Sequence, residues 1–180
     1  MDIAILTLSA SDNCGSLLQA YALQQILRNI GHKVVVLNYI TKKSKKMYRT
    51  LHPSYIKSPQ KLIGSLFRYK ALKSQKKDYE YFRENYLNMS AQKYANITAL
   101  ATADGQYDFI ICGSDQVWNI NMRDFDDAYL LRWCKMSKKA GYAVSLGDRE
   151  NTDSNNLKRK IKKLDDFFAI SVREKSALKD

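Results

Sequence analysis

The chain has 180 residues, of which 45% are hydrophobic, so it is long and apolar enough for one globular domain and is not a disordered polymer. No apolar run approaches the roughly 20 residues that span a bilayer, and the N-terminus lacks the basic start of a signal peptide, so we expect a cytoplasmic protein. The net charge of +12 is local, because residues 42–83 hold 13 Lys and Arg against two acids, while the rest of the chain is nearly neutral.

Residue types that ligate metals are scarce. The three cysteines, Cys14, Cys112 and Cys134, form no CxxC pair, and the chain has two histidines. These are too few ligands for a zinc site of the usual kind, and an odd cysteine count argues against a disulfide framework. We therefore expect no metal site and no cofactor, and we interpret the cysteines as small buried residues.

The first 37 residues predict a strand, a helix and a second strand. Ile3 to Leu8 is an apolar run of strand length, and Lys33 to Leu37 is rich in β-branched residues. Between them, apolar residues recur three or four positions apart, which predicts a helix: Ala20, Leu23, Leu27 and Ile30, with Ile26 beside them. A strand, a helix and a strand in so short a segment form a βαβ unit, so we expect the two strands to be parallel.

A basic helical insertion is predicted at about residues 41–90. Residues 41–58 are polar and typical of a loop, and Pro59 suits the first position of a helix. Apolar residues then keep helical spacing: Leu62, Leu66, Tyr69, Tyr79, Phe82 and Tyr86. This pattern indicates one or two amphipathic helices whose lysines face outward.

The remainder of the chain alternates strands with a helix. Residues 107–112, 139–146 and 168–172 are apolar runs that predict strands. A helix is predicted between the last two, with an N-cap and three apolar residues on its inner face: Ser154, Leu157, Ile161 and Leu164. Such alternation predicts a doubly wound α/β sheet, and such sheets bind ligands at the carboxyl ends of their strands.

The loop from Asn13 to Ser16 opens the first predicted helix. Free N–H groups and the helix dipole make this position suitable for an anion, and Gly15 allows a ligand to approach the backbone closely. Alternatively, Asn13 or Ser16 caps the helix. The residues alone leave both alternatives open.

The loop from Gly113 to Asn119 holds five polar groups and an indole within seven residues, a density that core packing does not require. Asp115, Gln116 and Asn119 are candidates for binding sugar hydroxyls, and Trp118 is a candidate for stacking on a sugar face. The alternative is that Asp115 and Asn119 organise the turn while Trp118 packs beneath it.

Two further polar positions follow predicted strands. Ser145 and Gly147 stand at one strand end, where they would face a ligand. Arg173 follows the last strand and is a candidate for binding a carboxylate or a phosphate, the alternative being an ion pair with Glu174 or another carboxylate. No catalytic set is complete, and the absence of GxSxG excludes the nucleophile elbow of an α/β-hydrolase.

Four segments resemble, in order, the motifs of the polysaccharide pyruvyl transferase family of bacteria. Residues 13–23 resemble its opening pattern N-x-G-S-x-L-Q-A-Y-A-L. Residues 107–119, with Y-D and then G-S-D-Q-V-W-N, are similar to its second signature, the most specific of the four. Residues 142–147 resemble Y-A-x-S-x-G, and residues 171–174 resemble S-x-R-[ED].

The resemblance implies an enzyme that moves the enolpyruvyl unit of phosphoenolpyruvate onto a sugar of an exopolysaccharide, a capsule or a cell-wall polymer. It also implies a GT-B-like architecture, with the active site between two Rossmann-like domains. The resemblance covers nearly all of this chain but about half the length of family members. We therefore expect residues 1–180 to be the N-terminal Rossmann-like domain, with the second domain absent. The implied partners are phosphoenolpyruvate and a sugar acceptor, which is commonly lipid-linked.

Within this resemblance, Asp115 is the candidate acid or base, because ketal formation needs proton transfer near the acceptor hydroxyl. Arg173 is the candidate for binding the anionic groups of the donor. The other candidate substrate-binding residues lie in the same motifs: Asn13, Gly15, Ser16, Gln19, Gly113, Ser114, Gln116, Trp118, Asn119, Ser145 and Gly147.

Other functions stay open. Residues 42–83 combine lysines with aromatic residues and would suit a phosphate backbone, although no named nucleic-acid motif is present, so we expect no specific nucleic acid. The same segment would suit peripheral contact with an anionic membrane at its inner face, which adds to the transferase interpretation. A Rossmann-like binding module, or a truncated remnant without catalysis, is the alternative to an enzyme.

Overall fold

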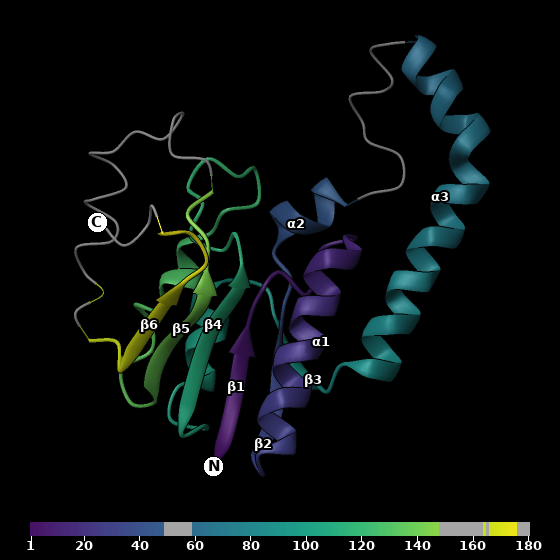
Figure 1. The fold of residues 1–180 in the computed structure, drawn as a ribbon. Coiled ribbons are helices and arrows are strands. Elements are labelled where there is room, and N and C mark those ends of the chain that lie inside the picture. Colours follow the sequence, from purple (N-terminus) through teal and green to yellow (C-terminus); the bar gives the residue numbers. More distant parts are fainter. Residues whose placement is uncertain (49–58, 148–163, 165, 176–180) are drawn as a thin grey trace.

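The computed structural model describes residues 1–48, 59–147, 164 and 166–175, with the backbone alone for residues 59–68 (Figure 1). Within these residues, six strands form one sheet whose neighbours are all parallel, in the order β3-β2-β1-β4-β5-β6. The strands are β1 (Asp2–Leu6), β2 (Lys33–Tyr39), β3 (Met89–Tyr94), β4 (Phe109–Asp115), β5 (Lys138–Val144) and β6 (Ala169–Val172). The helices are α1 (Cys14–Asn29), α2 (Lys42–Met47), α3 (Pro59–Tyr86) and α4 (Ile97–Leu100), with short 3-10 helices η2 (Ala101–Ala103) and η3 (Asp127–Leu130).

The strand order confirms the predicted doubly wound, Rossmann-like sheet. From β1 the chain passes outward to β2 and β3, and it then returns to place β4 on the other side of β1. Ile3 lies opposite Val34 of β2 on one side and opposite Phe109 of β4 on the other. The strand order therefore reverses between β1 and β4, and sheets of this kind bind ligands beyond the carboxyl ends of the strands at such a point.

The central strands are apolar because both of their faces are covered. Successive residues of β1 enter different clusters, since Ile5 packs with Leu23 of α1 and Val34, whereas Leu6 packs with Ile110 on the opposite face. Both Ile5 and Leu6 are fully buried. A strand buried on both faces needs a continuous apolar run, which is why the sequence predicted this strand correctly.

Helix α1 buries a narrower stripe than the sequence predicted. Leu17, Ala20 and Leu23 are buried, but Ile26 and Ile30 are 55% and 64% exposed. The sheet covers one side of the helix, and α3 packs beside it through edge-on contacts of Phe82 and Tyr86 with a single α1 tyrosine. The apolar face that the spacing predicts is therefore buried in its first part and exposed at Ile30.

The insertion contains more regular structure than predicted. The expected loop at residues 41–58 includes α2, whose N-cap Thr41 accepts a hydrogen bond from the backbone N–H of Ser44 at 3.0 Å. Helix α3 begins at Pro59, as predicted. Beyond it, β3 was missed, because an edge strand with exposed Ala91, Gln92 and Lys93 has no apolar alternation to reveal it. In Figure 1, α3 extends beyond the carboxyl ends of the strands.

The expected burial of the cysteines holds for two of the three. Cys14 is exposed at the start of α1, whereas Cys112 and Cys134 are buried as predicted. Burial, with the nearby carboxylate of Asp104, raises the pKa of the Cys134 thiol to about 12, so that this thiol is an unreactive core group. The helix predicted from Ser154 falls outside the described residues, apart from Leu164, which is buried.

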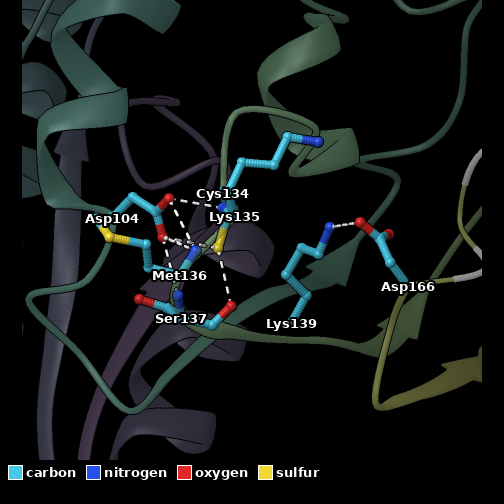
Figure 2. Close-up of polar contacts among 7 residues, drawn as sticks. All are labelled: Asp104, Cys134, Lys135, Met136, Ser137, Lys139 and Asp166. Atoms are coloured by element: carbon cyan, nitrogen blue, oxygen red, sulfur yellow. Dashed lines mark hydrogen bonds and ion pairs between the residues drawn. The ribbon is translucent and has the colours of Figure 1, made fainter.

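At the amino ends of the strands, Asp104 holds the turn that precedes β5 (Figure 2). Its carboxylate accepts hydrogen bonds from the backbone N–H groups of Lys135 at 2.6 Å, Met136 at 3.0 Å and Ser137 at 2.9 Å. Burial by itself would raise the pKa of Asp104, but these hydrogen bonds together outweigh it and lower that pKa. The turn is thus fixed by one charged side chain from outside it.

None of the helices in the described part of the chain is long and apolar enough to cross a membrane.

Candidate functional site

The carboxyl edge of the sheet brings together residues from all four sequence motifs. The loop after β1 leads into α1, and β4 and β5 end beside it, with β6 next to β5 (Figure 1). Three hydrogen bonds between side chains join these segments across 99, 154 and 29 residues of sequence. They place the candidate residues at the point where the strand order reverses.

The first of these contacts joins α1 to the end of β4. Ser16 donates its hydroxyl hydrogen to Oδ2 of Asp115 at 2.6 Å. The other oxygen of the carboxylate, Oδ1, accepts from the backbone N–H of Gln116 at 2.8 Å. Asp115 is half-buried. The carboxylate is thus fixed in orientation by two hydrogen bonds and remains partly open to solvent, as a proton-transferring group requires.

The second contact joins α1 to the end of β6. Arg173 donates from Nη2 to Oε1 of Gln19 at 2.7 Å, and its backbone N–H donates to the carbonyl oxygen of Val144 at 3.0 Å. The Arg173 side chain is exposed. Of the predicted alternatives, an ion pair between Arg173 and Glu174 is not formed in the described structure. The guanidinium therefore carries its charge at the edge of the sheet.

The third contact joins the ends of β5 and β6. Ser145 is fully buried and donates its hydroxyl hydrogen to Oε1 of Glu174 at 2.6 Å, while it accepts from the backbone N–H of Gly147 at 3.1 Å. Oε2 of Glu174 is buried and has no hydrogen-bond partner among the described residues. Sequence reasoning treated Glu174 as a partner for Arg173 alone, although it lies in the fourth motif. The structure makes it a second carboxylate of the site.

Trp118 does not have the position that sugar stacking requires. It is 3% exposed, its indole N–H donates to the carbonyl oxygen of Tyr129 at 3.0 Å, and its ring meets that of Phe167 edge-on at 5.9 Å. The expectation that Trp118 contacts a sugar is corrected, because the indole lies in the core beneath the loop. This was the alternative that the sequence left open.

Gly113 and Ser114 belong to β4 itself and not to the loop after it. Both are buried, so they support the site from within the sheet. A Cβ atom at Gly113 would lie 2.2 Å from the carbonyl oxygen of Tyr142 on β5, and its φ is +113°. Only glycine allows the two strands this approach. Gly113 thus has a structural role in the sheet, and binding of a ligand by Gly113 or Ser114 stays a prediction.

The loop that follows β4 is held by its own polar side chains. Asn119 donates from Nδ2 to Oε1 of Gln116 at 3.0 Å, and Gln116 is exposed. Gly147, with φ of +72°, packs so closely that a Cβ atom there would lie 2.1 Å from Nδ2 of Asn119. Gln116 and Asn119 thus stay accessible at the edge, and Gly147 connects their loop to the end of β5.

The start of α1 is capped by its own side chain. Oδ1 of Asn13 accepts from the backbone N–H groups of Gly15 at 2.8 Å and Ser16 at 3.4 Å. These are the N–H groups that an anion at the helix start would use. The capping alternative therefore describes the structure, and Arg173 is left as the cationic group of the predicted site.

A second group of polar residues, which sequence reasoning missed, borders the same edge. Arg83 of α3 pairs with Asp12 at 3.1 Å, and Tyr48 after α2 donates to Asp124 at 2.7 Å. Burial and then the Asp124 carboxylate raise the pKa of the Tyr48 hydroxyl. A cavity of about 200 Å³ lies here, with Asp12, Arg83 and Tyr48 in its lining. No motif spacing marked these residues, since they come from the insertion and from irregular loops.

The described residues contain no group of three or more His, Cys, Asp or Glu side chains placed to hold a metal ion. The fold and the edge residues together define a Rossmann-like α/β domain with a cluster of polar side chains at its switch point, where such sheets bind ligands.

A model of the family described as polysaccharide pyruvyl transferase matches residues 13–179, which include every residue named at this edge except Asp12. The chain belongs to that family. A search of the curated proteins and a search of the solved structures found no match. The family therefore indicates pyruvyl transferase activity in general, and it leaves the donor and the acceptor to be assigned.

Proposed function

We propose that the protein transfers a pyruvyl group from phosphoenolpyruvate to a sugar of an exopolysaccharide, a capsule or a cell-wall polymer. The observation that carries the proposal is the 2.6 Å hydrogen bond between Ser16 and Asp115 at the switch point of the sheet. It joins two motifs that lie far apart in the sequence, at the place where sheets of this class bind ligands. Membership of the family supports the transferase class.

Ketal formation sets the demand on the site. Two hydroxyl oxygens of the acceptor form bonds to C2 of the enolpyruvyl group, and the bond between C2 and the phosphate oxygen breaks. One hydroxyl proton ends on C3, which becomes a methyl carbon, and the other leaves with the phosphate. The reaction therefore needs groups that take protons from two hydroxyls in turn and return one to carbon.

Asp115 is proposed as the first of these groups. Its carboxylate is oriented by Ser16 and is half-buried, so an acceptor hydroxyl can reach it from the edge of the sheet. Glu174 is proposed as the second carboxylate, because no described residue donates a hydrogen bond to its buried Oε2, which can therefore accept one from a ligand. Two carboxylates at one edge suit two successive proton transfers.

Arg173 is proposed to bind an anionic group of the donor. Its exposed guanidinium is positioned by Gln19 at 2.7 Å, and its planar fork matches a carboxylate with two parallel hydrogen bonds. The helix start is already capped by Asn13, which favours Arg173 for this role.

The test is phosphate release from phosphoenolpyruvate in the presence of candidate sugars, measured on the polypeptide as its native source makes it. Asp115→Asn is expected to lower kcat by about 100- to 10,000-fold with little change in KM for the donor, because it removes proton transfer and leaves binding intact. Asp108→Asn is the matched control, since Asp108 is exposed at the amino edge, and its rate should equal that of the wild type. Full activity of Asp115→Asn, or no use of phosphoenolpyruvate with any acceptor, contradicts the proposal.

A further inference from the structure

A basic surface stands beside the site. It consists of α2 and residues 69–83 of α3, and we call it the basic lobe. Its two acidic residues are Asp78 and Glu80. Seven of its lysines are exposed: Lys42, Lys43, Lys45, Lys46, Lys70, Lys73 and Lys77.

The positive charge of the lobe is left almost unneutralised. Among the described residues, the one ion pair that involves the lobe is that of Arg83 with Asp12. Lys43 and Lys76 donate to backbone carbonyl groups, which orient the ammonium groups but carry no charge. The exposed lysines therefore project a positive field into solvent.

The lysines of α3 form a line. Lys70, Lys73 and Lys77 are three and four residues apart, so they share one face of the helix along about 10 Å. In Figure 1, this helix extends past the carboxyl ends of the strands, and α2 lies between it and the loops of the site. The cationic groups are thus spread along an extended surface, which suits a partner that is itself broad and negatively charged.

The lobe is attached to the loops that form the site. Tyr48, which ends α2, donates to Asp124 in the loop region after β4. Arg83 donates to the carbonyl oxygen of Ser11 at 3.1 Å, in the loop after β1, as well as to Asp12. Because of these contacts, a partner that binds the basic lobe also sets the orientation of the carboxyl edge of the sheet.

From these observations we propose that the basic lobe docks on an anionic lipid bilayer and holds the candidate site next to the headgroups. The exposed cations in the described part of the lobe are lysines, and a lysine is a hydrated point charge that acts on a headgroup layer without direct contact. Nucleic-acid sites add arginine forks and free aromatic faces. Here the lobe's arginine, Arg83, is half-buried and paired with Asp12. Among its tyrosines, Tyr79 packs against α1, Lys73 lies over the ring of Tyr69 at 5.9 Å, and Tyr81 is the one that is mostly exposed.

Docking goes beyond the proposed function and is independent of it, since it needs neither donor nor acceptor. Each lysine near an anionic surface is expected to change the partition coefficient by roughly fivefold. The effect is electrostatic, so it weakens as salt shortens the screening length from about 8 Å to about 3 Å.

The experiment is sedimentation of the whole protein with vesicles, without substrates. One set of vesicles contains phosphatidylcholine alone, and the other an equal mixture of phosphatidylcholine and phosphatidylglycerol. The protein is expected to sediment with the mixed vesicles only and to be released by high salt. A lobe variant with Lys70, Lys73 and Lys77 all changed to Gln is expected to lose roughly 100-fold in partitioning.

The matched control removes three charges elsewhere, at Arg28, Lys33 and Lys135, which are exposed and lie away from the lobe. It has the same net charge as the lobe variant, so it should bind nearly as well as the wild type. All six residues are exposed, and thermal unfolding followed by circular dichroism checks that both variants fold. No sedimentation with mixed vesicles, or equal losses in the two variants, overturns the proposal. Tighter, lobe-dependent binding to duplex DNA or RNA than to these vesicles also overturns it.

Discussion

The two edges of the sheet each contain an aspartate that receives hydrogen bonds from distant parts of the chain, and the two aspartates differ in what donates to them. At the amino edge, Asp104 accepts from three consecutive backbone N–H groups of the turn before β5 (Figure 2). At the carboxyl edge, Asp115 accepts from the side-chain hydroxyl of Ser16 and from the backbone N–H of Gln116. Backbone donors cannot turn away from Asp104, whereas a serine hydroxyl can rotate toward a ligand.

This difference separates a carboxylate that supports the fold from the one that we propose for proton transfer. Asp104 is committed to a turn, and its contacts lower its pKa. At the carboxyl edge, by contrast, Oε2 of Glu174 accepts no hydrogen bond from any described residue. The following substitutions test this division, from the largest expected change in stability to the smallest.

Trp118→Ala is expected to destabilise the protein by about 3–5 kcal/mol, because it leaves a large cavity beneath the site loop. Urea unfolding of the wild type and the variant measures this loss. Trp118→Phe is the control, since it keeps a ring beside Phe167 but loses the hydrogen bond to Tyr129, and it should cost less. If Trp118→Ala has unchanged stability and a raised KM for the acceptor, Trp118 contacts the sugar and is not a core residue.

Asp104→Asn is expected to lower stability by about 2–3 kcal/mol, because the turn loses hydrogen bonds to a charged acceptor. Its activity per folded molecule should be that of the wild type. Asp108→Asn is the comparison, since Asp108 accepts a single backbone hydrogen bond, at 2.8 Å from Asp2, and should lose less than about 1 kcal/mol. If the two variants lose the same free energy of unfolding, the three N–H donors of the turn stabilise the fold no more than a single donor does.

The Asp104 effect should also depend on pH. Its folded-state pKa is lowered from the ordinary value of 3.8, so its contribution to stability is present above that value. The contribution is lost as pH falls through the lowered folded-state pKa. Urea titrations at neutral pH and at about pH 3 should therefore show the difference between wild type and Asp104→Asn becoming smaller in acid. A difference that grows in acid contradicts the assigned direction.

Asp166→Asn should have the smallest effect, below about 1 kcal/mol. Asp166 pairs with Lys139 of β5 (Figure 2), and this hydrogen bond lowers the pKa of Asp166. The Asp166 side chain is 53% exposed and that of Lys139 is 6% exposed, so water and salt reach the pair from the side of the carboxylate. The difference from wild type should vanish in high salt, and a loss that persists there would identify a buried ion pair instead.

The sequence predicted those parts of the molecule whose reasons are local. Strands buried on both faces are continuous apolar runs, and the start of α3 at Pro59 follows from the fixed φ of proline. The gathering of the motifs at one edge also followed, because parallel strands bring their carboxyl ends together. Edge strand β3 and the exposure of Ile26 could not be predicted, since they depend on which neighbour covers a surface.

At the site, residue types were visible in the sequence but their partners were not. Nothing in the spacing indicated that Arg173 would meet Gln19 instead of Glu174, or that Trp118 would face inward. The contribution of Tyr48 and Arg83 was also hidden, because they come from an insertion without a motif. Tertiary packing decides which residues become partners, and no short sequence pattern indicates that packing.

The sequence distance between partners at the carboxyl edge has a consequence for how the protein is made. Gln19 emerges early during synthesis, and Arg173 follows 154 residues later. The first βαβ unit can form from local contacts, but contacts that close long loops are slow to form. A nascent chain that has completed β1, α1 and β2 therefore has a framework without a binding site. The candidate site is complete only after β6 has joined the sheet.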